Sequence, residues 1–384
     1  MATGAWIWIL MGSVNESLGG LLSLAFDESS CRSRFESAKL LKPPNHTPSP
    51  YLLEKLRSYE ALHQKCGPNT ELYRESIRQL TSNRSGGGPT ECNYVVWLPQ
   101  HALGNRMISI TSAFLYALLN DKVLLLFFPD CMNGLFCEPF PNTTWLLPSN
   151  FPITHVTSIF DKDPNRYGNL LRDKILRNDM NITNASIPLP AYLYLHLVHN
   201  NNDYDRMFYC EDAQLLLRQF PCLDTKDAAA LSDIIRVKPK AVLVTSLKSE
   251  YFERIRDTYY RNATATGEVI GVYQPSHEEK QFTEKLDHNV KALAEIYLLS
   301  LRDSLITSQY STFGYVAQGL GGIRPWLLVR LDDENLCLQS STMEPCFHFP
   351  PSFECKSRRE LDLGSVVPYV RHCEDKAGGI KLFY

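Results

Sequence analysis

Hydrophobic runs and helical patterns alternate along the second half of the chain. Short apolar runs suited to buried strands are separated by longer stretches in which apolar residues recur every three or four positions. This alternation predicts right-handed βαβ units and a doubly wound parallel sheet. The predicted strands are Ala241–Thr245, Glu268–Tyr273, Leu305–Thr307 and Trp326–Leu331, and the predicted helices are Glu250–Tyr260, Leu286–Leu301 and Phe313–Leu320.

The clearest helical pattern lies at Leu286–Leu301. Its apolar residues have the i, i+3, i+4, i+7 spacing that places side chains on one face, as in helices that pack on a core. This face consists of Val290, Leu293, Ala294, Tyr297, Leu298 and Leu301.

The first half contains a further strand, helix and strand. Tyr94–Leu98 is a strand run, Ile108–Leu119 carries a helical apolar stripe, and Val123–Phe128 is a continuous apolar run suited to a buried parallel strand. Before them, polar residues and turn signals surround one helical stretch at Tyr51–His63, which predicts a stem packed on a domain edge. The predicted units are a stem at residues 1–90, one lobe at 91–230, and a second lobe at 231–384 with a cysteine-containing tail.

Composition is that of an ordinary globular protein. The chain has 384 residues, 44% of them hydrophobic and 21% charged, enough to bury a large core across two domains. The formal net charge is −3 and there is no long basic run. Nucleic acid and anionic membrane surfaces are therefore not expected partners.

Cysteine and asparagine usage indicates the compartment. Eleven cysteines lack the paired C-x-x-C spacing of a zinc site, which favours disulfides and leaves at least one thiol unpaired. N-x-S/T sequons favour an oxidising, glycosylating lumen, with Asn142 and Asn262 as the expected glycosylation sites. The alternative is a cytosolic enzyme with buried free thiols and accidental sequons. The seven sequons begin at Asn15, Asn45, Asn83, Asn142, Asn181, Asn184 and Asn262.

The N-terminal apolar run does not explain entry into that lumen. Ala5–Met11 is about a third of the roughly 20 residues that a membrane-spanning helix requires, so it does not form an anchor. It also lacks the basic region that precedes the apolar core of a signal peptide.

Two loops at the carboxyl ends of predicted strands are candidate anion sites, because open α/β sheets bind ligands there. Gly104-Asn105-Arg106 opens a helix, where free N–H groups favour an anion and a forked guanidinium matches phosphate oxygens. A simple turn with a solvated arginine fits equally well. Ser311-Thr312-Phe313-Gly314 also lies between a strand and a helix, and helix capping alone would explain its hydroxyls.

Signatures of several other enzyme classes are missing. The chain has no G-x-S-x-G, H-E-x-x-H or G-x-x-x-x-G-K-[ST], which argues against an α/β-hydrolase, a zincin and a P-loop NTPase. His348 and His372 lie among tail cysteines that could mimic zinc ligands, but disulfides are the favoured interpretation. No metal is expected.

Six long blocks carry a family resemblance. The blocks are Leu103–Ser109, Leu135–Pro148, Tyr192–Leu197, Ala241–Leu247, Ser311–Gly322 and Met343–His348. Together they resemble the plant xyloglucan fucosyltransferases, in the right order, from about Gly19 to Leu382.

The resemblance implies an α/β protein with two Rossmann-like lobes in a variant GT-B glycosyltransferase fold, the first lobe on the acceptor side and the second on the GDP-sugar side. It implies a lumenal Golgi enzyme, anchored as a type II membrane protein. The enzyme would move L-fucose from GDP-fucose to O2 of a galactosyl residue in a polysaccharide such as xyloglucan, with inversion and without a metal or other cofactor. A homodimer or a complex with other Golgi transferases would be a further partner.

An inverting transfer also needs a base for the acceptor hydroxyl. Asp130 and Glu138 are acidic candidates, but both also fit as surface or capping residues, so the base is left unassigned. The residues expected to contact donor or acceptor are Gly104, Asn105, Arg106, Thr245, Ser246, Tyr273, Ser311, Thr312, Phe313 and Gly314.

Three departures from the family pattern stand out. Ala102-Leu103 replaces a glycine-containing segment before Gly104, and the membrane anchor is missing. In addition, only about thirty residues separate Phe208–Asp212 from Ala241–Leu247, where family members place several strands and helices. One of those strands ends in an arginine that engages the donor diphosphate, and Arg236 only superficially matches it. The fold is therefore expected to be incomplete, and the alternative function is an inactive relative that binds glycan or associates with active transferases.

Overall fold

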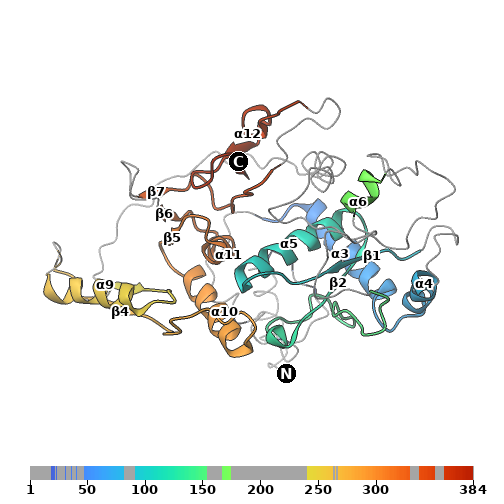
Figure 1. The fold of residues 1–384 in the computed structure, drawn as a ribbon, viewed down its shortest axis with the longest axis horizontal. Helices are drawn as coiled ribbons and strands as arrows, with labels where there is room; N and C mark the ends of the chain where they lie inside the picture. The colour runs from blue at the N-terminus through green and yellow to red at the C-terminus, as the bar shows by residue number, and fades with distance from the viewer. Residues whose placement is uncertain are drawn as a thin grey trace, which may run out of the picture.

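A computed structural model describes residues 19–21, 23, 31, 36, 40, 47–81, 91–153, 167–173, 240–262, 264, 267–328, 337–350 and 359–383. Within these ranges the protein is a mixed α/β fold built from small sheets (Figure 1). No helix among the described residues is long and apolar enough to cross a membrane.

The first lobe is organised around one βαβ unit. Strand β1 (Tyr94–Trp97) pairs in parallel with β2 (Val123–Leu126), and α5 (Leu103–Leu119) connects them. All four residues of β2 are buried, as its continuous apolar run predicts. The predicted strand, helix and strand are confirmed, but α5 begins five residues before the predicted Ile108.

Two helices of the N-terminal region pack into the core of this lobe. Helix α3 (Pro50–Cys66) begins after the N-cap Ser49, whose Oγ accepts a hydrogen bond from the N–H of Leu52. Helix α4 (Glu71–Thr81) was not predicted, and it buries Tyr73 and Ile77 against the sheet. Three short elements complete the described part of this half: α6 (Tyr167–Arg172), the 3-10 turn η1 (Asp130–Met132) and the isolated bridge between Leu126 and Leu146.

The second half contains the predicted strands and helices, with ends shifted by a few residues. Strand β3 pairs in parallel with β4, and β5 pairs in parallel with β6, which continues into an antiparallel β7. The chain ends in an antiparallel β8–β9 hairpin. The elements are β3 (Lys240–Leu243), α9 (Ser249–Arg261), β4 (Ile270–Tyr273), α10 (Leu286–Ser300), β5 (Ile306–Ser308), α11 (Thr312–Gly321), β6 (Trp326–Leu328), β7 (Cys337–Gln339), α12 (Leu363–Val366), β8 (Val370–His372) and β9 (Ile380–Leu382).

Among the described residues, the parallel strands of the expected doubly wound sheet do not form one continuous sheet. The parallel pairs β3–β4 and β5–β6 belong to separate sheets, although β4 is joined to β5 by α10 as in a continuous sheet. Figure 1 shows α9 and β4 as an arm that extends from the body beside α10.

The apolar face predicted for α10 is also not buried. Val290, Tyr297 and Leu298 are exposed, while Ile296 and Leu299 on another side of the helix are buried. That side packs against α11 and against Met107 and Ile108 of α5, in the cluster that joins the two lobes. Among the described strands, none covers this exposed stripe of α10.

Disulfides hold the described segments together. Cys31 pairs with Cys137, Cys66 with Cys92, and Cys346 with Cys373. Of the remaining described cysteines, Cys131 is a buried thiol and Cys337 an exposed one. The expectation that most cysteines are oxidised and some are left over is confirmed for these residues; Cys210, Cys222 and Cys355 lie outside them.

Candidate functional site

The two predicted anion-binding loops meet in the structure. A Cβ atom placed on Gly104 would lie 2.9 Å from the backbone nitrogen of Phe313 and 2.9 Å from Thr312 Oγ1. The first turn of α5 therefore lies directly against the first turn of α11, and only glycine permits this approach. The starts of α5 and α11, about 200 residues apart in sequence and one from each lobe, therefore lie side by side.

Glycine is equally required at the start of α11. A Cβ atom on Gly314 would lie 2.0 Å from Oγ1 of Thr307, the middle residue of β5, which is closer than van der Waals contact permits. Ser311 caps this helix, because its Oγ accepts a hydrogen bond from the N–H of Gly314 at 3.2 Å. Capping is thus observed for Ser311, while the N–H groups of Thr312 and Phe313 have no acceptor within their own helix and can face an anion.

Arg106 is not the solvated arginine of the simpler interpretation. Its side chain is buried, its Nη2 lies 2.8 Å from Glu284 Oε1, and its Nη1 donates to Cys131 Sγ at 3.2 Å. Asn289 fixes the same junction, since its Nδ2 donates to the carbonyls of Cys131 and Thr283. Arg106 therefore joins α5 to the segment before α10.

The carboxylate that neutralises Arg106 is accessible. The side chain of Glu284 is 71% exposed, whereas that of Arg106 is 4% exposed. Partial desolvation raises the pKa of Glu284, but the hydrogen bond and charge of Arg106 outweigh it and leave this pKa below its usual value. An incoming anion could take the place of this exposed carboxylate on the buried guanidinium.

Thr245, Ser246 and Tyr273 lie at the carboxyl ends of β3 and β4, as predicted. Ser246 Oγ accepts from the N–H of Lys248, and the carbonyl of Ser246 accepts from Gln274 Nε2 at 2.9 Å. Tyr273 is exposed and folds over the neighbouring Gly271 of its own strand. No hydrogen bond among the described residues links these three to the first turn of α11.

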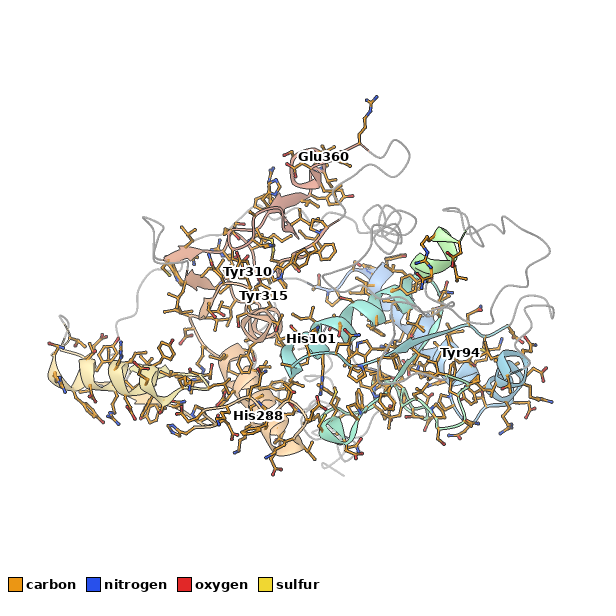
Figure 2. The ribbon with its side chains drawn as sticks, viewed as in Figure 1. Tyr94, His101, His288, Tyr310, Tyr315 and Glu360 are labelled. Atoms are coloured by element: carbon orange, nitrogen blue, oxygen red, sulfur yellow. A yellow bond between two sulfur atoms is a disulfide. The ribbon has the colours of Figure 1, made fainter. Side chains whose placement is uncertain are left out.

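Sequence reasoning missed a buried polar cluster beside α11. Tyr315 donates its hydroxyl to Asp375 Oδ2 at 2.5 Å and lies 2.7 Å from His348 Nε2. Asp375 Oδ2 also accepts from the N–H of Tyr310, whose φ is 58° (Figure 2 labels Tyr310 and Tyr315). The cluster holds the left-handed turn that leads into Ser311, so it positions the start of α11.

The chemistry of this cluster suppresses ionisation of its phenol. Burial raises the pKa of Tyr315, and the Asp375 carboxylate raises it further, so Tyr315 acts as a hydrogen-bond donor. Tyr315 and His348 lie within the blocks that carry the family resemblance, but Asp375 does not. The 60 residues between Tyr315 and Asp375 explain why no local pattern connected them.

The two acidic candidates for the base have structural partners. Glu138 accepts hydrogen bonds from Thr144 Oγ1 at 2.6 Å and from the N–H of Trp145 at 3.0 Å, so it braces its own loop. Asp130 begins η1 and accepts from Asn133 Nδ2 at 3.4 Å. Both make local hydrogen bonds, which fits the structural roles that the sequence also allowed.

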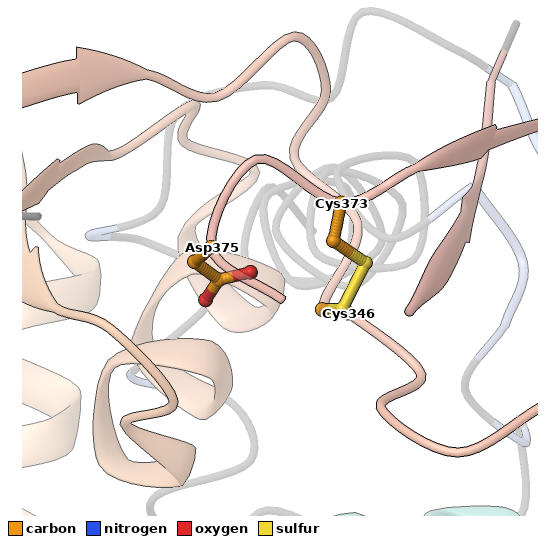
Figure 3. A group of neighbouring side chains, drawn as sticks. All are labelled: Cys346, Cys373 and Asp375. Carbon is orange, nitrogen blue, oxygen red and sulfur yellow. A yellow bond between two sulfur atoms is a disulfide. The ribbon is translucent and has the colours of Figure 1, made fainter. Parts of the chain in front are cut away.

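Potential metal ligands in the tail are otherwise occupied. Cys346, Cys373 and Asp375 lie close together, but the two cysteines form a disulfide and offer no thiolate (Figure 3). His348 contacts the hydroxyl of Tyr315, and Nε2 of His372 lies 3.1 Å from the Asp362 carboxylate. Cys346 and Cys373 therefore form a disulfide, as favoured from the sequence, while Cys355 lies outside the described residues.

Both expected glycosylation sites are accessible. Asn142 and Asn262 are exposed, and Asn262 follows the last residue of α9. The resemblance block Tyr192–Leu197, the segment Phe208–Asp212 and Arg236 lie outside the described residues.

Comparison with known proteins decides the family. The family model for xyloglucan fucosyltransferase matches residues 11–227 and 221–356. The chain belongs to the xyloglucan fucosyltransferase family. It is 38% identical to a galactoside 2-alpha-L-fucosyltransferase of Pisum sativum, with 95% of this chain and 81% of the relative covered. A protein of the same name from Arabidopsis thaliana is also 38% identical, over 95% of this chain and 82% of the relative.

A solved structure extends the family assignment to the fold. The structure of Arabidopsis thaliana FUT1, as an arginine-to-lysine variant in complex with GDP, is 36% identical with a TM-score of 0.80. It covers 95% of this chain and 99% of that chain. The described small sheets and helices therefore follow a known glycosyltransferase architecture.

The same comparisons show that this family member is shortened internally. The alignment with the Pisum sativum relative spans 469 positions, and 384 residues cannot fill it, so at least 85 positions (469 less 384) have no counterpart here. The family match breaks into two pieces at residues 221–227, between the blocks where the missing segment was expected. The break comes shortly before β3 (Lys240–Leu243).

Proposed function

We propose that this protein has the site of a galactoside 2-alpha-L-fucosyltransferase, which takes L-fucose from GDP-fucose and transfers it with inversion to a galactosyl residue of a polysaccharide such as xyloglucan. The observation that carries the proposal is the contact of Gly104 with Thr312 and Phe313, because it brings two helix N-termini together. Two such ends favour a doubly charged diphosphate.

Each predicted contact has a physical role in this proposal. The N–H groups of Thr312 and Phe313 would bind diphosphate oxygens, and the Thr312 hydroxyl would add a donor. Gly104 and Asn105 would border the transferred sugar from the opposite lobe. Because the diphosphate gains negative charge as the fucosyl bond breaks, donors fixed at this place stabilise the transition state more than the ground state.

Thr245, Ser246 and Tyr273 are proposed to contact the nucleoside end of the donor. They follow β3 and β4 at the carboxyl edge, and Tyr273 presents an exposed ring on which a base could stack. Leu243, at the end of β3, packs in the same cluster as residues of α5, α10 and α11, so this edge adjoins the two helix starts.

Golgi lumenal location and the absence of a metal requirement are proposed with this activity. Three disulfides and two exposed sequon asparagines support an oxidising, glycosylating compartment.

A second candidate function is favoured by the missing positions. A family member that lacks at least 85 aligned positions could bind glycan or associate with active transferases without catalysing transfer. The two functions share the acceptor surface and differ in donor turnover.

Calorimetry with GDP tests the proposed donor site. We expect the chain to bind GDP, Thr312→Ala to weaken binding by about tenfold, and Gly319→Ala, a change in the same helix, to leave it unaltered. A chain that binds galactosylated xyloglucan oligosaccharide but not GDP would support the second function. Equal GDP affinities for the chain and for Thr312→Ala would contradict the proposed donor contacts.

A further inference from the structure

Two parallel strand pairs in the second half have the connections of one sheet but do not touch. The chain runs β3, α9, β4, α10, β5, α11, β6, the order of consecutive βαβ units. Among the described strands, β3 pairs with β4 alone, and β5 pairs with β6 alone. One edge of β3 and one edge of β5 are therefore left without a described strand partner.

The doubly wound strand order accounts for this separation. In that order the first strand of the unit lies in the centre, the second and third lie on one side of it, and the fourth and fifth on the other. If β3 is the second strand, then β3 and β4 form one side, and β5 and β6 the other. The strand that has no counterpart among the described residues is the first, which would lie between β3 and β5.

The family match is interrupted at the corresponding point of the sequence. The first strand of such a unit precedes the second in the chain, and the family match breaks at residues 221–227, shortly before β3. The Pisum sativum relative has at least 85 aligned positions that this chain lacks, enough for a strand with its helix.

Exposed apolar side chains mark the surfaces that a central strand and its helix would cover. Ile306 of β5 is 62% exposed and Leu328 of β6 is 49% exposed. The middle residues of these strands, Thr307 and Leu327, point to the opposite face, toward α11, and are buried. On α10, Val290, Tyr297 and Leu298 form the exposed stripe described above. A sheet covered on one face only, with an unpaired inner edge, is typical of a fold that lacks a layer.

We propose that the space between β3 and β5 is a strand-binding slot, and that its occupant is the internal segment that full-length family members carry before the counterpart of β3. The segment would insert one strand parallel to β3 and β5 and cover Ile306 and Leu328 with apolar side chains. Backbone hydrogen bonds along both edges would provide affinity, as in other cases of strand addition. The kind of partner is thus a polypeptide of this family, and binding does not require the transfer reaction.

Co-expression tests the slot directly. The full chain is produced together with the isolated internal segment of the Pisum sativum relative, carrying its own affinity tag. We expect the two to co-purify in a one-to-one complex with a higher melting temperature than the chain alone. Hydrogen exchange should slow at least tenfold at amides of both β3 and β5.

Matched variants distinguish binding in the slot from non-specific hydrophobic association. Ile306→Asp places a charge on the face to be covered, and Val366→Asp places one on α12, at a residue with the same 62% exposure. Ile306→Asp should abolish co-purification, and Val366→Asp should preserve it. Should Ile306→Asp fail to fold, Leu298→Asp on the exposed stripe of α10 serves in its place.

Three results would overturn the proposal. In the first, the separate segment does not co-purify with the chain, although a fusion of the same segment into the chain melts cooperatively. The second is binding without slower exchange in β3 and β5. The third is a chain that dimerises alone and already protects both strands, which would identify a second copy as the occupant.

Discussion

Single glycines set how closely the two helix starts approach. Gly104→Ala should destabilise the fold by about 1–3 kcal/mol, because its methyl group would meet Thr312 and Phe313 with no room to shift. Gly314→Ala should cost at least as much, since its methyl group would lie 2.0 Å from Thr307 Oγ1. Thermal unfolding measures both.

Gly319→Ala is the matched control for these substitutions. Its methyl group would have Pro345 Cγ at 3.9 Å as its nearest neighbour, so the gain in helix propensity, about 0.5–1 kcal/mol, should dominate. Equal melting temperatures for all three variants would show that the contact at Gly104 is not tight.

A buried histidine makes the first lobe sensitive to acid. His63 lies between Thr143 Oγ1 at 3.0 Å and the carbonyl of Leu124 at 3.2 Å, and desolvation lowers its pKa from the usual 6.5. The unfolded chain then binds this proton more readily than the folded one. Stability should therefore fall as pH drops below about 6.5 toward the folded pKa.

Denaturant titrations of the free energy of unfolding at pH 7.5 and 5 test this. His63→Gln should reduce the difference between the two pH values, whereas His101→Asn, at an exposed residue with φ of 60°, should not. A pH dependence unchanged by His63→Gln would assign the acid sensitivity to other groups.

At the scale of elements, the junction between α5 and the segment before α10 combines a structural pair with a candidate ligand site. Arg106→Ala should weaken GDP binding by tenfold or more, because it removes a buried guanidinium near two helix starts. Glu284→Gln should leave GDP affinity equal or higher, since it removes only the competing carboxylate. Calorimetry with Arg324→Ala, an exposed arginine, provides the control.

A structural role of Arg106 and a role in GDP binding give different outcomes. If Arg106 only joins the lobes, Arg106→Ala and Glu284→Gln should both lower the melting temperature and neither should change GDP affinity in a properly folded sample. Equal GDP affinity for Arg106→Ala and Arg324→Ala would remove Arg106 from the donor site.

Apolar periodicity predicted the helices and strands well, but it predicted poorly which elements pack against one another. The runs at Val123–Phe128 and Leu286–Leu301 became a strand and a helix, because strand and helix spacing are local properties. Which face of α10 is buried depends on its packing against α11 and α5, which local spacing does not reveal. Helix α4 was missed because its charged residues mask the apolar positions Tyr73 and Ile77.

The candidate site was predictable to the same extent. Gly104 and Ser311–Gly314 were identified separately from their places before helices, but their contact depends on the packing of α5 against α11. The Asp375 cluster joins residues far apart in sequence, so no spacing rule could find it. Arg106 was recognised as a candidate, while its pairing with Glu284, 178 residues away, was not.

At the scale of the whole molecule, we expect fold and activity to depend on the same missing segment. We predict that this chain, expressed with a signal peptide, will transfer little or no fucose from GDP-fucose to a galactosylated xyloglucan oligosaccharide. A version restored with the segment of a full-length relative should be active. Two physical reasons support this expectation: exposed apolar faces favour association over folding, and the resemblance places a diphosphate-binding arginine in the missing segment.

The two reasons are separable, because they act on different quantities. Loss of a charge-assisted contact at the leaving diphosphate lowers the rate by about 10²-fold or more without altering the fold. A monodisperse, cooperatively melting but inactive chain would therefore point to the missing arginine. An aggregating chain would point to the open sheet, since unpaired edges and uncovered faces associate. Turnover within about tenfold of a full-length family member would show that neither loss matters, because a deficit that small is well below the 10²-fold expected for the arginine alone.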